Sequence, residues 1–516
     1  MTNQAQLLAV WICAITLAPM RVLAGQCGDL VSLTIPDTNV MSAEIVSAAV
    51  TPGRGRGPAT NVPSHCRVMA VAKPVTDSEI HLEVWLPSPE QWNGKFLGTG
   101  NGGYSGSLST TEMSEALTLG YAVAGSDTGH QGGDLKFGAG HSEKINDWGF
   151  RAIHVMTENA KLIVRAYYGR FPQRAYFTGC STGGHQALSE AQRYPADYDG
   201  IVAGDPGNDR VHLNANFLWA YTALHKEPGN DLPAAKLPVI TKAAMAACDA
   251  ADGIKDGIIA DARQCKFDPG VLLCKGSDEP GCLTAPQLAT LKKIYDGPRN
   301  PRTGARIMPG FPIGSESGWT GYFVGQREPA RTDFWRLWVF NNPAWEWRNF
   351  DFDADLAYAD RKLAAVNAVE TDLREFRANH GKLLIYQGWA DPVVPPEGTI
   401  LYFEAMEKRM QGPRATSDFA RLFMVPGMGH CSGGVGPSSF DALSALDVWA
   451  TNGTAPAKIV ASHSTAGKVD RTRPLCPYPL TARWKGTGST DDANSFYCGV
   501  VPRVKTAVNK NNGTSK

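Results

Sequence analysis

A serine and a histidine, residue types that cooperate in acyl transfer, each stand beside a cysteine in this chain. Ser181 lies in the segment GCSTG, which has the G-x-S-x-G pattern of a nucleophile elbow, and His430 lies in VPGMGHCSGG. A disulfide holds its two Cα atoms about 5.5 Å apart. A bridge between Cys180, before the serine, and Cys431, after the histidine, would therefore make the two side chains neighbours. The sequence thus suggests a catalytic pair and the covalent link that assembles it.

The segments on either side of Ser181 favour the elbow. RAYFTG, residues 174–179, is short and aromatic and follows turn residues, which predicts a strand. GGHQALSEAQRYP, residues 183–195, predicts a helix that ends before its proline. G-x-S-x-G alone is weak evidence, because glycine and serine are common in loops. In this strand–turn–helix setting the glycines would let strand and helix approach closely, so we predict that Ser181 is a nucleophile.

A carboxylate that could orient the histidine follows another predicted strand. α/β-Hydrolases place this acid between the serine and the histidine in chain order. KLLIYQG, residues 382–388, has the composition of a buried parallel strand, and Asp391 follows it at the edge where catalytic loops collect. ARLFMV, residues 420–425, predicts one more strand before His430. A turn aspartate and an ordinary loop histidine are the alternatives to a triad of Ser181, His430 and Asp391.

These segments together resemble the tannase and feruloyl esterase family. The resemblance runs from about Cys27 to Cys498, and its marks are GCSTGG, GWADPVVPP, PGMGHCSGG and RTRPLCPYP. A cysteine beside both the serine and the histidine is the distinctive signature of this family. The resemblance implies an α/β-hydrolase core, a large inserted lid domain with a calcium site, the triad given above and a bridge between its flanking cysteines. The family contains feruloyl esterases, tannases and a bacterial mono(2-hydroxyethyl) terephthalate hydrolase.

The length of 516 residues exceeds one ordinary domain, and 43 % hydrophobic residues suffice for a large core. We expect residues 25–206 and 379–516 to form the α/β catalytic domain together. Residues 207–378, which are rich in Trp, Pro and Gly, would form the lid domain between the nucleophile and the acid.

Residues 1–24 have features of a secretory signal. LLAVWICAITLAPM is too short to span a bilayer comfortably, and the VLA that follows favours cleavage after Ala24. The missing Lys or Arg before the apolar stretch departs from the usual pattern. A lipoprotein is disfavoured, because Gln26 precedes Cys27 where a small residue is expected. We therefore expect a secreted or periplasmic protein that has no membrane association after the signal is removed.

The cysteine count agrees with export. Of eleven cysteines, Cys13 would leave with the signal, and the even number that remains is usual in an oxidising compartment. The sequence alone leaves their pairing open. The resemblance implies the pairs Cys27–Cys66, Cys180–Cys431, Cys248–Cys265, Cys274–Cys282 and Cys476–Cys498.

The balance of charge gives no support to nucleic-acid or membrane-surface binding. The chain has 50 acidic and 50 basic residues, and removal of the signal takes away only Arg21. A protein that binds either polyanion generally carries excess positive charge. We therefore expect no nucleic-acid partner.

Three aspartates fall within eight residues of the lid segment CDAADGIKDGIIADARQC. Carboxylates so close repel one another unless a cation neutralises them, and Ca²⁺ prefers oxygen ligands on glycine-bearing loops. The spacing is not that of an EF-hand, and a solvated acidic helix start is the alternative. The resemblance favours a structural calcium site, with the ligands Asp249, Asp252, Asp256 and the backbone carbonyls of Ile254 and Ile258.

An oxyanion hole needs two backbone N–H groups. One belongs to the residue after the nucleophile, here Thr182. The loop GKFLGTGNGGYSGSL could supply the other, because glycines let backbone amides approach a developing oxyanion. The resemblance assigns Gly103, while Gly102 is a close rival and a plain turn is the alternative.

Aromatic residues of the lid are candidates for substrate recognition. Five of the thirteen tryptophans fall within 29 residues: Trp319, Trp335, Trp338, Trp345 and Trp347. Aromatic walls suit flat acyl groups, although aromatic clusters usually belong to the core. We expect Trp319 to contact the substrate, with Trp389 and Val393 bordering the pocket beside Asp391.

The predicted function is that of a secreted serine esterase acting on esters of aromatic acids, chiefly hydroxycinnamates such as ferulate. Such a substrate could be free or attached to plant polysaccharide. Galloyl esters, as in tannases, and mono(2-hydroxyethyl) terephthalate are alternatives within the family. A catalytically silent hydrolase fold used for binding is an alternative of another class, and the intact triad argues against it.

Overall fold

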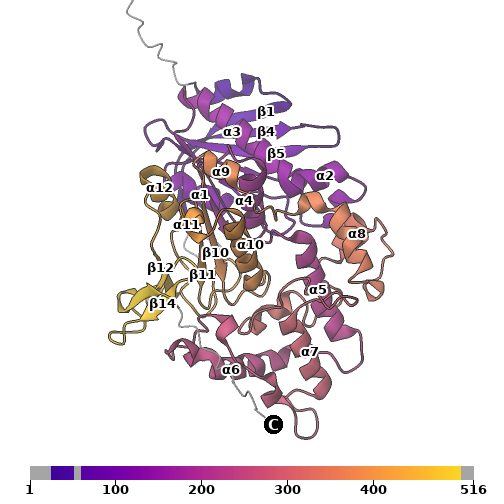
Figure 1. Ribbon diagram of the computed structural model, residues 1–516. Helices are drawn as coiled ribbons and strands as arrows, with labels where there is room; N and C mark the ends of the chain where they lie inside the picture. The colour runs from indigo at the N-terminus through magenta and orange to yellow at the C-terminus, as the bar shows by residue number, and fades with distance from the viewer. Residues whose placement is uncertain (1–24, 52–59, 501–516) are drawn as a thin grey trace, which may run out of the picture.

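A nine-stranded sheet forms the centre of the molecule, for which a computed structural model describes residues 25–51 and 60–500 (Figure 1). The strand order is β1-β4-β5-β7-β6-β8-β9-β10-β11. The pairs from β1 to β7 are antiparallel, and those from β7 to β11 are parallel. The strands are β1 (Thr38–Val46), β4 (His65–Ala72), β5 (Ile80–Pro87), β6 (Lys95–Thr99), β7 (Ala122–Ser126), β8 (Arg174–Cys180), β9 (Gly200–Gly204), β10 (Lys382–Gly388) and β11 (Ala420–Val425).

Helices cover both faces of the sheet, as the composition of its strands requires. β7 and β9 are buried along their whole length, which is typical of parallel strands covered on both sides. One apolar cluster joins the sheet to α3 (Ala152–Tyr168), α4 (Thr182–Arg193) and α10 (Pro396–Arg409). A second cluster joins it to α1 (Thr110–Thr118) and α12 (Ala442–Asn452). The arrangement is that of an α/β-hydrolase, and β8, β10 and β11 confirm the three strands predicted around the candidate triad.

Most of the segment between β9 and β10 forms the lower part of the molecule in Figure 1, while its last helix lies higher, beside the sheet. Its own apolar cluster is rich in buried aromatic rings and includes Tyr104 and Trp148 from the sheet domain, so the insertion packs directly onto the core. Leu373 and Phe376 near its end instead join the cluster around the sheet. The domain limits at 206 and 379 stay a prediction. The helices are α5 (Arg210–His225), α6 (Leu237–Cys248), α7 (Ala285–Asp296), α8 (Ala354–Lys362) and α9 (Arg374–Ala378).

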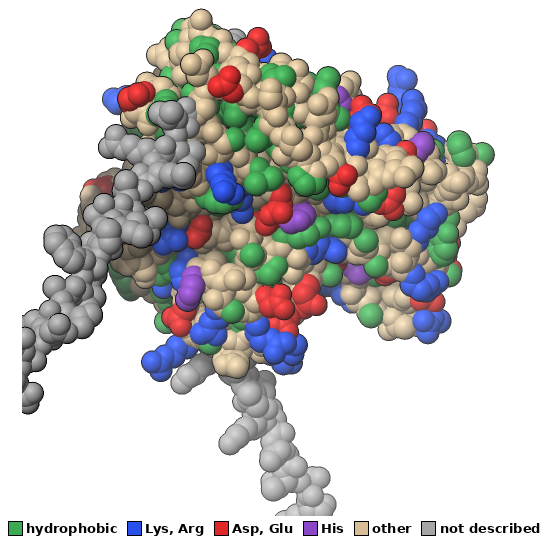
Figure 2. Space-filling view, turned by 90° about the horizontal axis from the view of Figure 1, so that it is seen from above, with side chains coloured by type: hydrophobic (Ala, Val, Ile, Leu, Met, Phe, Trp, Pro, Cys, Tyr) green, Lys and Arg blue, Asp and Glu red, His purple; other side chains and the backbone are tan. Residues whose placement is uncertain are grey.

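Small elements complete the chain. Three two-stranded sheets pair β2 (Ala49–Thr51) with β3 (Thr60–Val62), β12 (Ile459–Thr465) with β13 (Lys468–Leu475), and β14 (Thr481–Trp484) with β15 (Phe496–Gly499). The short helices are α2 (Ser142–Asn146) and α11 (Pro413–Thr416). Acidic and basic side chains intermingle over the face seen in Figure 2, in keeping with the balanced charge of the chain.

Five disulfides join cysteines of the described residues and confirm every predicted pair: Cys27–Cys66, Cys180–Cys431, Cys248–Cys265, Cys274–Cys282 and Cys476–Cys498. The expected signal segment, with Cys13, lies outside the described residues. Within residues 25–51 and 60–500, no helix has the length and apolarity needed to cross a membrane.

Candidate active site

Ser181 occupies the sharp turn between β8 and α4. Its φ of 65° and ψ of −114° are unfavourable for a residue with a side chain, and such strain is typical of functional sites. The turn depends on glycine. A Cβ on Gly179 would lie 2.6 Å from the Cα of Gly183, and one on Gly184 would lie 2.2 Å from the carbonyl oxygen of Gly204. Strand and helix therefore approach more closely at Ser181 than any larger residue permits.

His430 and Asp391 are hydrogen-bonded at the carboxyl edge of the sheet. His430 Nδ1 lies 2.8 Å from Asp391 Oδ2. The carboxylate is fully buried, and its Oδ1 accepts the backbone N–H groups of Val393 at 2.7 Å and Val394 at 3.0 Å. Gln387 Nε2 donates to Oδ2 at 3.0 Å. These donors fix the carboxylate toward the imidazole.

The surroundings of His430 raise its pKa above the ordinary value. Burial alone lowers the pKa, but the negative charge of Asp391 and the hydrogen bond to it raise it by more, with a smaller contribution from Asp205. Arg331 opposes this rise. A histidine in this setting can take a proton from a serine, because the resulting imidazolium is stabilised by the adjacent carboxylate.

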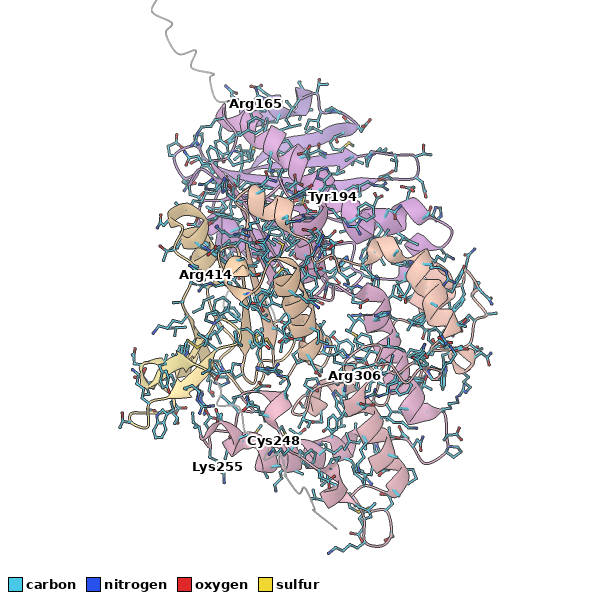
Figure 3. The ribbon with its side chains drawn as sticks, viewed as in Figure 1. Arg165, Tyr194, Cys248, Lys255, Arg306 and Arg414 are labelled. Atoms are coloured by element: carbon cyan, nitrogen blue, oxygen red, sulfur yellow. A yellow bond between two sulfur atoms is a disulfide. The ribbon has the colours of Figure 1, made fainter. Side chains whose placement is uncertain are left out.

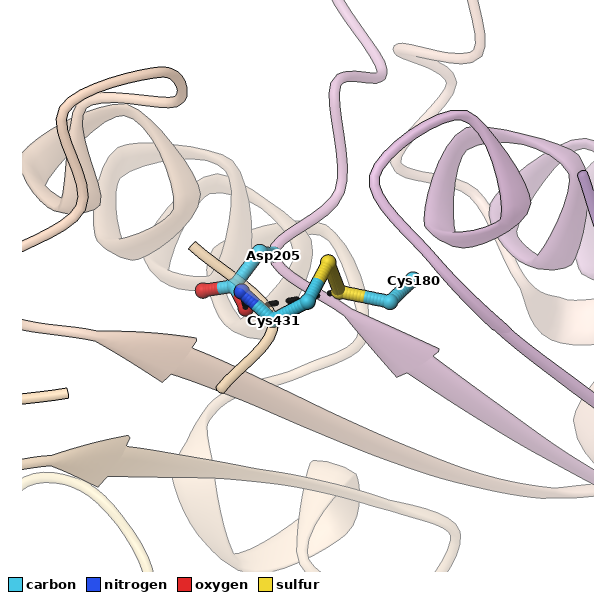
Figure 4. A group of neighbouring side chains, drawn as sticks. All are labelled: Cys180, Asp205 and Cys431. Atoms are coloured by element: carbon cyan, nitrogen blue, oxygen red, sulfur yellow. Dashed lines mark hydrogen bonds between the residues drawn. A yellow bond between two sulfur atoms is a disulfide. The ribbon is translucent and has the colours of Figure 1, made fainter. Parts of the chain in front are cut away.

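Asp205 is a component of the site that the sequence analysis missed. It follows β9, and its two oxygens accept backbone N–H groups from Gly388 and Cys431, each at 2.7 Å. Figure 4 shows Asp205 beside the Cys180–Cys431 disulfide. Because Gly388 leads into the loop of the candidate acid and Cys431 follows the candidate base, this one carboxylate joins two catalytic loops. Its position at a strand end was the available signal.

Asp205 also forms a compact titratable group with the candidate acid and base. The relevant carboxylate oxygens of Asp205 and Asp391 and a ring nitrogen of His430 all lie within 4.8 Å of one another. Burial, followed by the negative charge of Asp391, raises the pKa of Asp205 well above the usual range. The negative charge of Asp391 thus disfavours ionisation of Asp205, and the nearby imidazole of His430 favours it.

The two candidate oxyanion-hole residues touch each other. The hydroxyl of Thr182 donates to the carbonyl oxygen of Gly103 at 2.7 Å. Gly103 has a φ of 58°, and a Cβ there would meet nothing within 4 Å, so its backbone conformation rather than crowding favours glycine. The loop is anchored nearby, where the N–H of Asn101 donates to Gln186 Oε1 at 2.9 Å. Rigid placement of this kind suits donors that must meet a developing charge.

A cavity of about 390 Å³ connects the candidate residues. Ser181, His430, Gly102 and Gly103 all line it, and so does Val393, one of the three residues expected to contact the substrate. The volume lies within the range of small-molecule pockets.

The two tryptophans expected at the substrate lie elsewhere. Trp319 is fully buried in the core of the insertion, where it packs against Phe323 and its Nε1 donates to Ser315 Oγ at 3.0 Å. Trp389 is buried beneath Arg263, whose guanidinium lies 5.1 Å from its ring centroid. Neither belongs to the cavity wall. At both positions the large aromatic side chain is buried in the core and is therefore not available for contact with a substrate.

The insertion contributes Tyr322 and Arg331 to the cavity instead. Arg331 has a φ of 61°, its guanidinium lies 4.8 Å from the ring centroid of Phe217, and its buried Nη1 has no hydrogen-bond partner. The ion pairs of the described residues include none to Arg331, so its positive charge is unbalanced. No sequence motif marks either residue, because their place depends on how the insertion packs.

The three clustered aspartates form a loop after α6, beside the labelled Cys248 and Lys255 of Figure 3. Asp249 Oδ1 accepts the N–H groups of Asp256 at 3.0 Å and Gly257 at 2.8 Å. Asp256 Oδ2 pairs with Arg473 at 2.6 Å, both side chains being nearly inaccessible. Three carboxylates on a glycine-bearing loop are oxygen donors of the kind that Ca²⁺ prefers. Here they accept backbone N–H groups of the loop, Asp256 pairs with Arg473, and they are not among the described groups whose ligand atoms lie within 4.8 Å of one another.

Comparison with known proteins gives a consistent picture. The family model described as tannase and feruloyl esterase matches residues 66–499. An uncharacterized esterase of Xanthomonas campestris is 40% identical over 92% of both chains, and the mono(2-hydroxyethyl) terephthalate hydrolase of Piscinibacter sakaiensis is 31% identical over 86% of both. The crystal structure of feruloyl esterase B from Aspergillus oryzae superposes with a TM-score of 0.85 at 27% identity, covering 91% of this chain and 98% of that one. The protein is a carboxylic ester hydrolase and belongs to the tannase and feruloyl esterase family.

Proposed function

We propose that the protein hydrolyses esters of aromatic acids with a triad of Ser181, His430 and Asp391. One observation carries this proposal. The Cys180–Cys431 disulfide joins the residue before the serine to the residue after the histidine, while His430 Nδ1 lies 2.8 Å from Asp391. A purely structural disulfide has no need to bring Ser181 and His430 to one cavity with Asp391 hydrogen-bonded to the histidine.

The reaction follows from the arrangement of these groups. Ser181 Oγ forms a bond to the ester carbonyl carbon while Nε2 of His430 takes its proton, and Asp391 accepts the N–H at Nδ1 and holds the imidazole tautomer. The backbone N–H groups of Gly103 and Thr182 hold the oxyanion. The alkoxy C–O bond then breaks, and the imidazolium protonates the leaving alcohol. Water attacks the acyl-enzyme with the same base, which releases the acid and restores the serine.

The acyl group that we propose is a hydroxycinnamate such as ferulate, free or attached to plant polysaccharide. Close structural likeness to feruloyl esterase B supports this choice. The cavity of about 390 Å³ is large enough for a single aromatic ring with its ester. Galloyl esters have the same ring size, and they stay the nearest alternative.

A specific observation favours a second candidate, an acyl group that carries a carboxylate, as mono(2-hydroxyethyl) terephthalate does. Arg331 lines the cavity without an acidic partner among the described residues. A guanidinium binds a carboxylate through paired hydrogen bonds, whereas the phenol of ferulate offers it no charge. The 31% identical terephthalate monoester hydrolase is in keeping with this alternative.

Two further parts of the proposal concern calcium and location. We propose that Asp249, Asp252 and Asp256, with the carbonyls of Ile254 and Ile258, hold a calcium ion whose role is structural. When bound, Ca²⁺ would neutralise the acidic loop, with Arg473 assisting at Asp256. We also propose a secreted or periplasmic location, which the five disulfides support because such bridges persist in oxidising compartments.

A hydrolysis panel tests the substrate proposal. The substrates are methyl ferulate, methyl gallate, chlorogenate and mono(2-hydroxyethyl) terephthalate, each given to the wild type and to Arg331→Gln. We expect the highest kcat/KM on methyl ferulate or chlorogenate, with little effect of the substitution. Preference for the terephthalate monoester that Arg331→Gln abolishes would establish the second candidate. Hydrolysis of none of the four would refute the proposed function.

A further inference from the structure

Arg210 is a buried cation without an acidic partner. It opens α5, the first helix of the insertion, and only 1 % of its surface is exposed. The ion pairs of the described residues include none to Arg210, and its Nε has no hydrogen-bond partner. Burial lowers its pKa to about 10, which still leaves it charged at neutral pH. Burying an unpaired charge is costly, so this position calls for a physical explanation.

The guanidinium points at the candidate oxyanion hole. Arg210 Nη2 donates to the hydroxyl of Thr182 at 3.1 Å, and this hydroxyl donates to the carbonyl oxygen of Gly103 at 2.7 Å. A chain of hydrogen bonds thus links the cation to the two residues proposed to supply the oxyanion hole. Hydrogen bonds in such a chain polarise one another when they are shielded from water.

Among the described residues no carboxylate pairs with Arg210, and Tyr104 only partly offsets the effect of burial on its pKa. Its guanidinium carbon lies 5.2 Å from the ring centroid of Trp148 and 5.7 Å from that of Tyr104, and these π faces replace part of its hydration. Arg331 is a like charge. Burial, and then the charge of Arg210, lowers the pKa of His185 to about 3, so this histidine is neutral. The negative charge that Arg210 lacks in the resting enzyme is one that the reaction creates.

We infer that Arg210 is a positioning residue of the oxyanion hole, whose charge acts through the Thr182 hydroxyl to stabilise the tetrahedral oxyanion. This inference rests on the proposed function. It gives the insertion a part in the chemical step, because its first helix supplies the cation. The competing explanation is a tether that merely holds α5 against α4.

The test compares a probe that forms the oxyanion with one of the same shape that does not. Ser181 adds to 2,2,2-trifluoroacetophenone to give an anionic hemiketal, whereas acetophenone binds without charge. Arg210→Met removes the cation and Arg210→Lys keeps it. Arg193→Met is the matched control, because Arg193 ties the far end of α4 to the insertion through the carbonyls of Ala365 and Asn367 at 2.9 and 3.1 Å.

Arg210→Met should lose about 10- to 100-fold in kcat on p-nitrophenyl acetate, somewhat less than loss of a direct oxyanion donor. Affinity for the trifluoroketone should fall by the same factor, with KM and acetophenone binding nearly unchanged. Arg210→Lys should recover most of the loss at neutral pH. It should lose this recovery again as pH rises through the lowered pKa of a buried lysine, at a lower pH than the arginine enzyme, whose pKa at this position is about 10. Arg193→Met should leave the ratio of the two affinities as it is in the wild type.

If Arg210→Met loses affinity for both ketones equally, or for neither, the inference is overturned and Arg210 is only a tether between α5 and α4. If Arg210→Met does not fold, Thr182→Val decides, because it removes the connecting hydroxyl and retains the backbone N–H. We expect this variant to bind the trifluoroketone about tenfold more weakly than the wild type and acetophenone as tightly. An affinity change that is the same for both ketones would overturn the inference. A wild type that neither cleaves p-nitrophenyl acetate nor binds the trifluoroketone would refute the proposed function itself, which a result confined to Arg210 would not.

Discussion

The position and orientation of each side chain in this site are set by the groups that contact it. Ser181 is held in its turn because two neighbouring glycines leave no room for a Cβ. His430 is oriented because both oxygens of Asp391 accept hydrogen bonds. Restraint of this kind lets the reacting groups meet without reorganisation. It also makes each group separately testable by substitution.

Ser181→Ala should lower turnover by about 10⁴-fold or more, while the fold survives, because alanine fits the elbow. The measurement is steady-state hydrolysis of an activated ester, with circular dichroism and melting temperature as checks of folding. A variant that keeps more than about a tenth of the wild-type rate would remove Ser181 from its role.

The pH dependence should report His430. Its neutral form acts as the base, so kcat/KM should fall as pH is lowered through its pKa, which lies above the ordinary 6.5. Asp391→Asn removes the charge and hydrogen bond that raise this pKa, and the acid limb should then move to lower pH. Turnover should also fall by about 10⁴-fold, since the tautomer is no longer held. A pH–rate profile with a neutral ester measures both effects, and an unmoved acid limb would contradict the assignment.

At the scale of elements, the site is a junction of four loops that follow β6, β8, β10 and β11. The disulfide joins two of them and Asp205 joins two. Both links reach the loop after β11, which carries His430. A shift of this histidine away from the serine would lower the rate, so restraint of this loop matters most. A displacement of about 1 Å at a catalytic group can cost about 10²-fold in rate.

Removal of the bridge should therefore affect catalysis more than folding. A disulfide that closes a loop this long contributes about 4–5 kcal/mol in the chain-entropy model, and the other bridges reduce that figure. We expect the double variant Cys180→Ala, Cys431→Ala to remain folded and to lose most of its turnover. Cys274→Ala with Cys282→Ala, a bridge confined to the insertion, is the control and should retain activity. A folded and fully active first variant would show that the bridge has no positional role.

Asp205→Asn should lower kcat by about 10- to 100-fold with little change in KM, because one of the two loop N–H groups loses its acceptor. Stability should fall by about 1–3 kcal/mol for the same reason. Asp418→Asn, at an aspartate whose side chain is 71% exposed, is the control. Urea titration and kinetics on the same samples separate the two effects, and a fully active Asp205→Asn would mean that the loops are held without it.

At the scale of the whole molecule, the acidic loop couples the insertion to the C-terminal strands, since Asp256 pairs with Arg473 of β13. Chelation should lower the melting temperature of the wild type by a few degrees if calcium holds this region. Asp252→Ala should abolish that sensitivity, and it is preferable to a substitution at Asp256, which would also break the ion pair. Elemental analysis that finds no calcium, together with melting that is indifferent to chelator, would rule the site out.

The parts of the molecule that the sequence predicted are those with local signals. Strands around Ser181, Asp391 and His430 follow from short apolar runs and turn residues, and the cysteine pairs came with the family resemblance. Trp319 lies in the core and Arg331, which no sequence pattern marked, lines the cavity, because burial in the insertion is decided by long-range packing that leaves no local pattern. Asp205 had a local signal at its strand end, but a carboxylate between glycine and proline has the composition of an ordinary turn.

The connection of the insertion has a consequence for how such enzymes diversify. β9 and β10 are adjacent parallel strands, so the inserted segment leaves the sheet at its carboxyl edge after Gly204 and returns at the opposite edge, where Lys382 pairs with Gly200. A crossover between parallel strands has no fixed length, so the insertion can lengthen, shorten or be exchanged without shifting the register of any strand. A lineage can acquire new acyl preferences by replacing this segment while it inherits its catalytic machinery unaltered. The one part that must be inherited with the sheet is the short stretch through Arg210, where the exchangeable module and the ancestral chemistry meet.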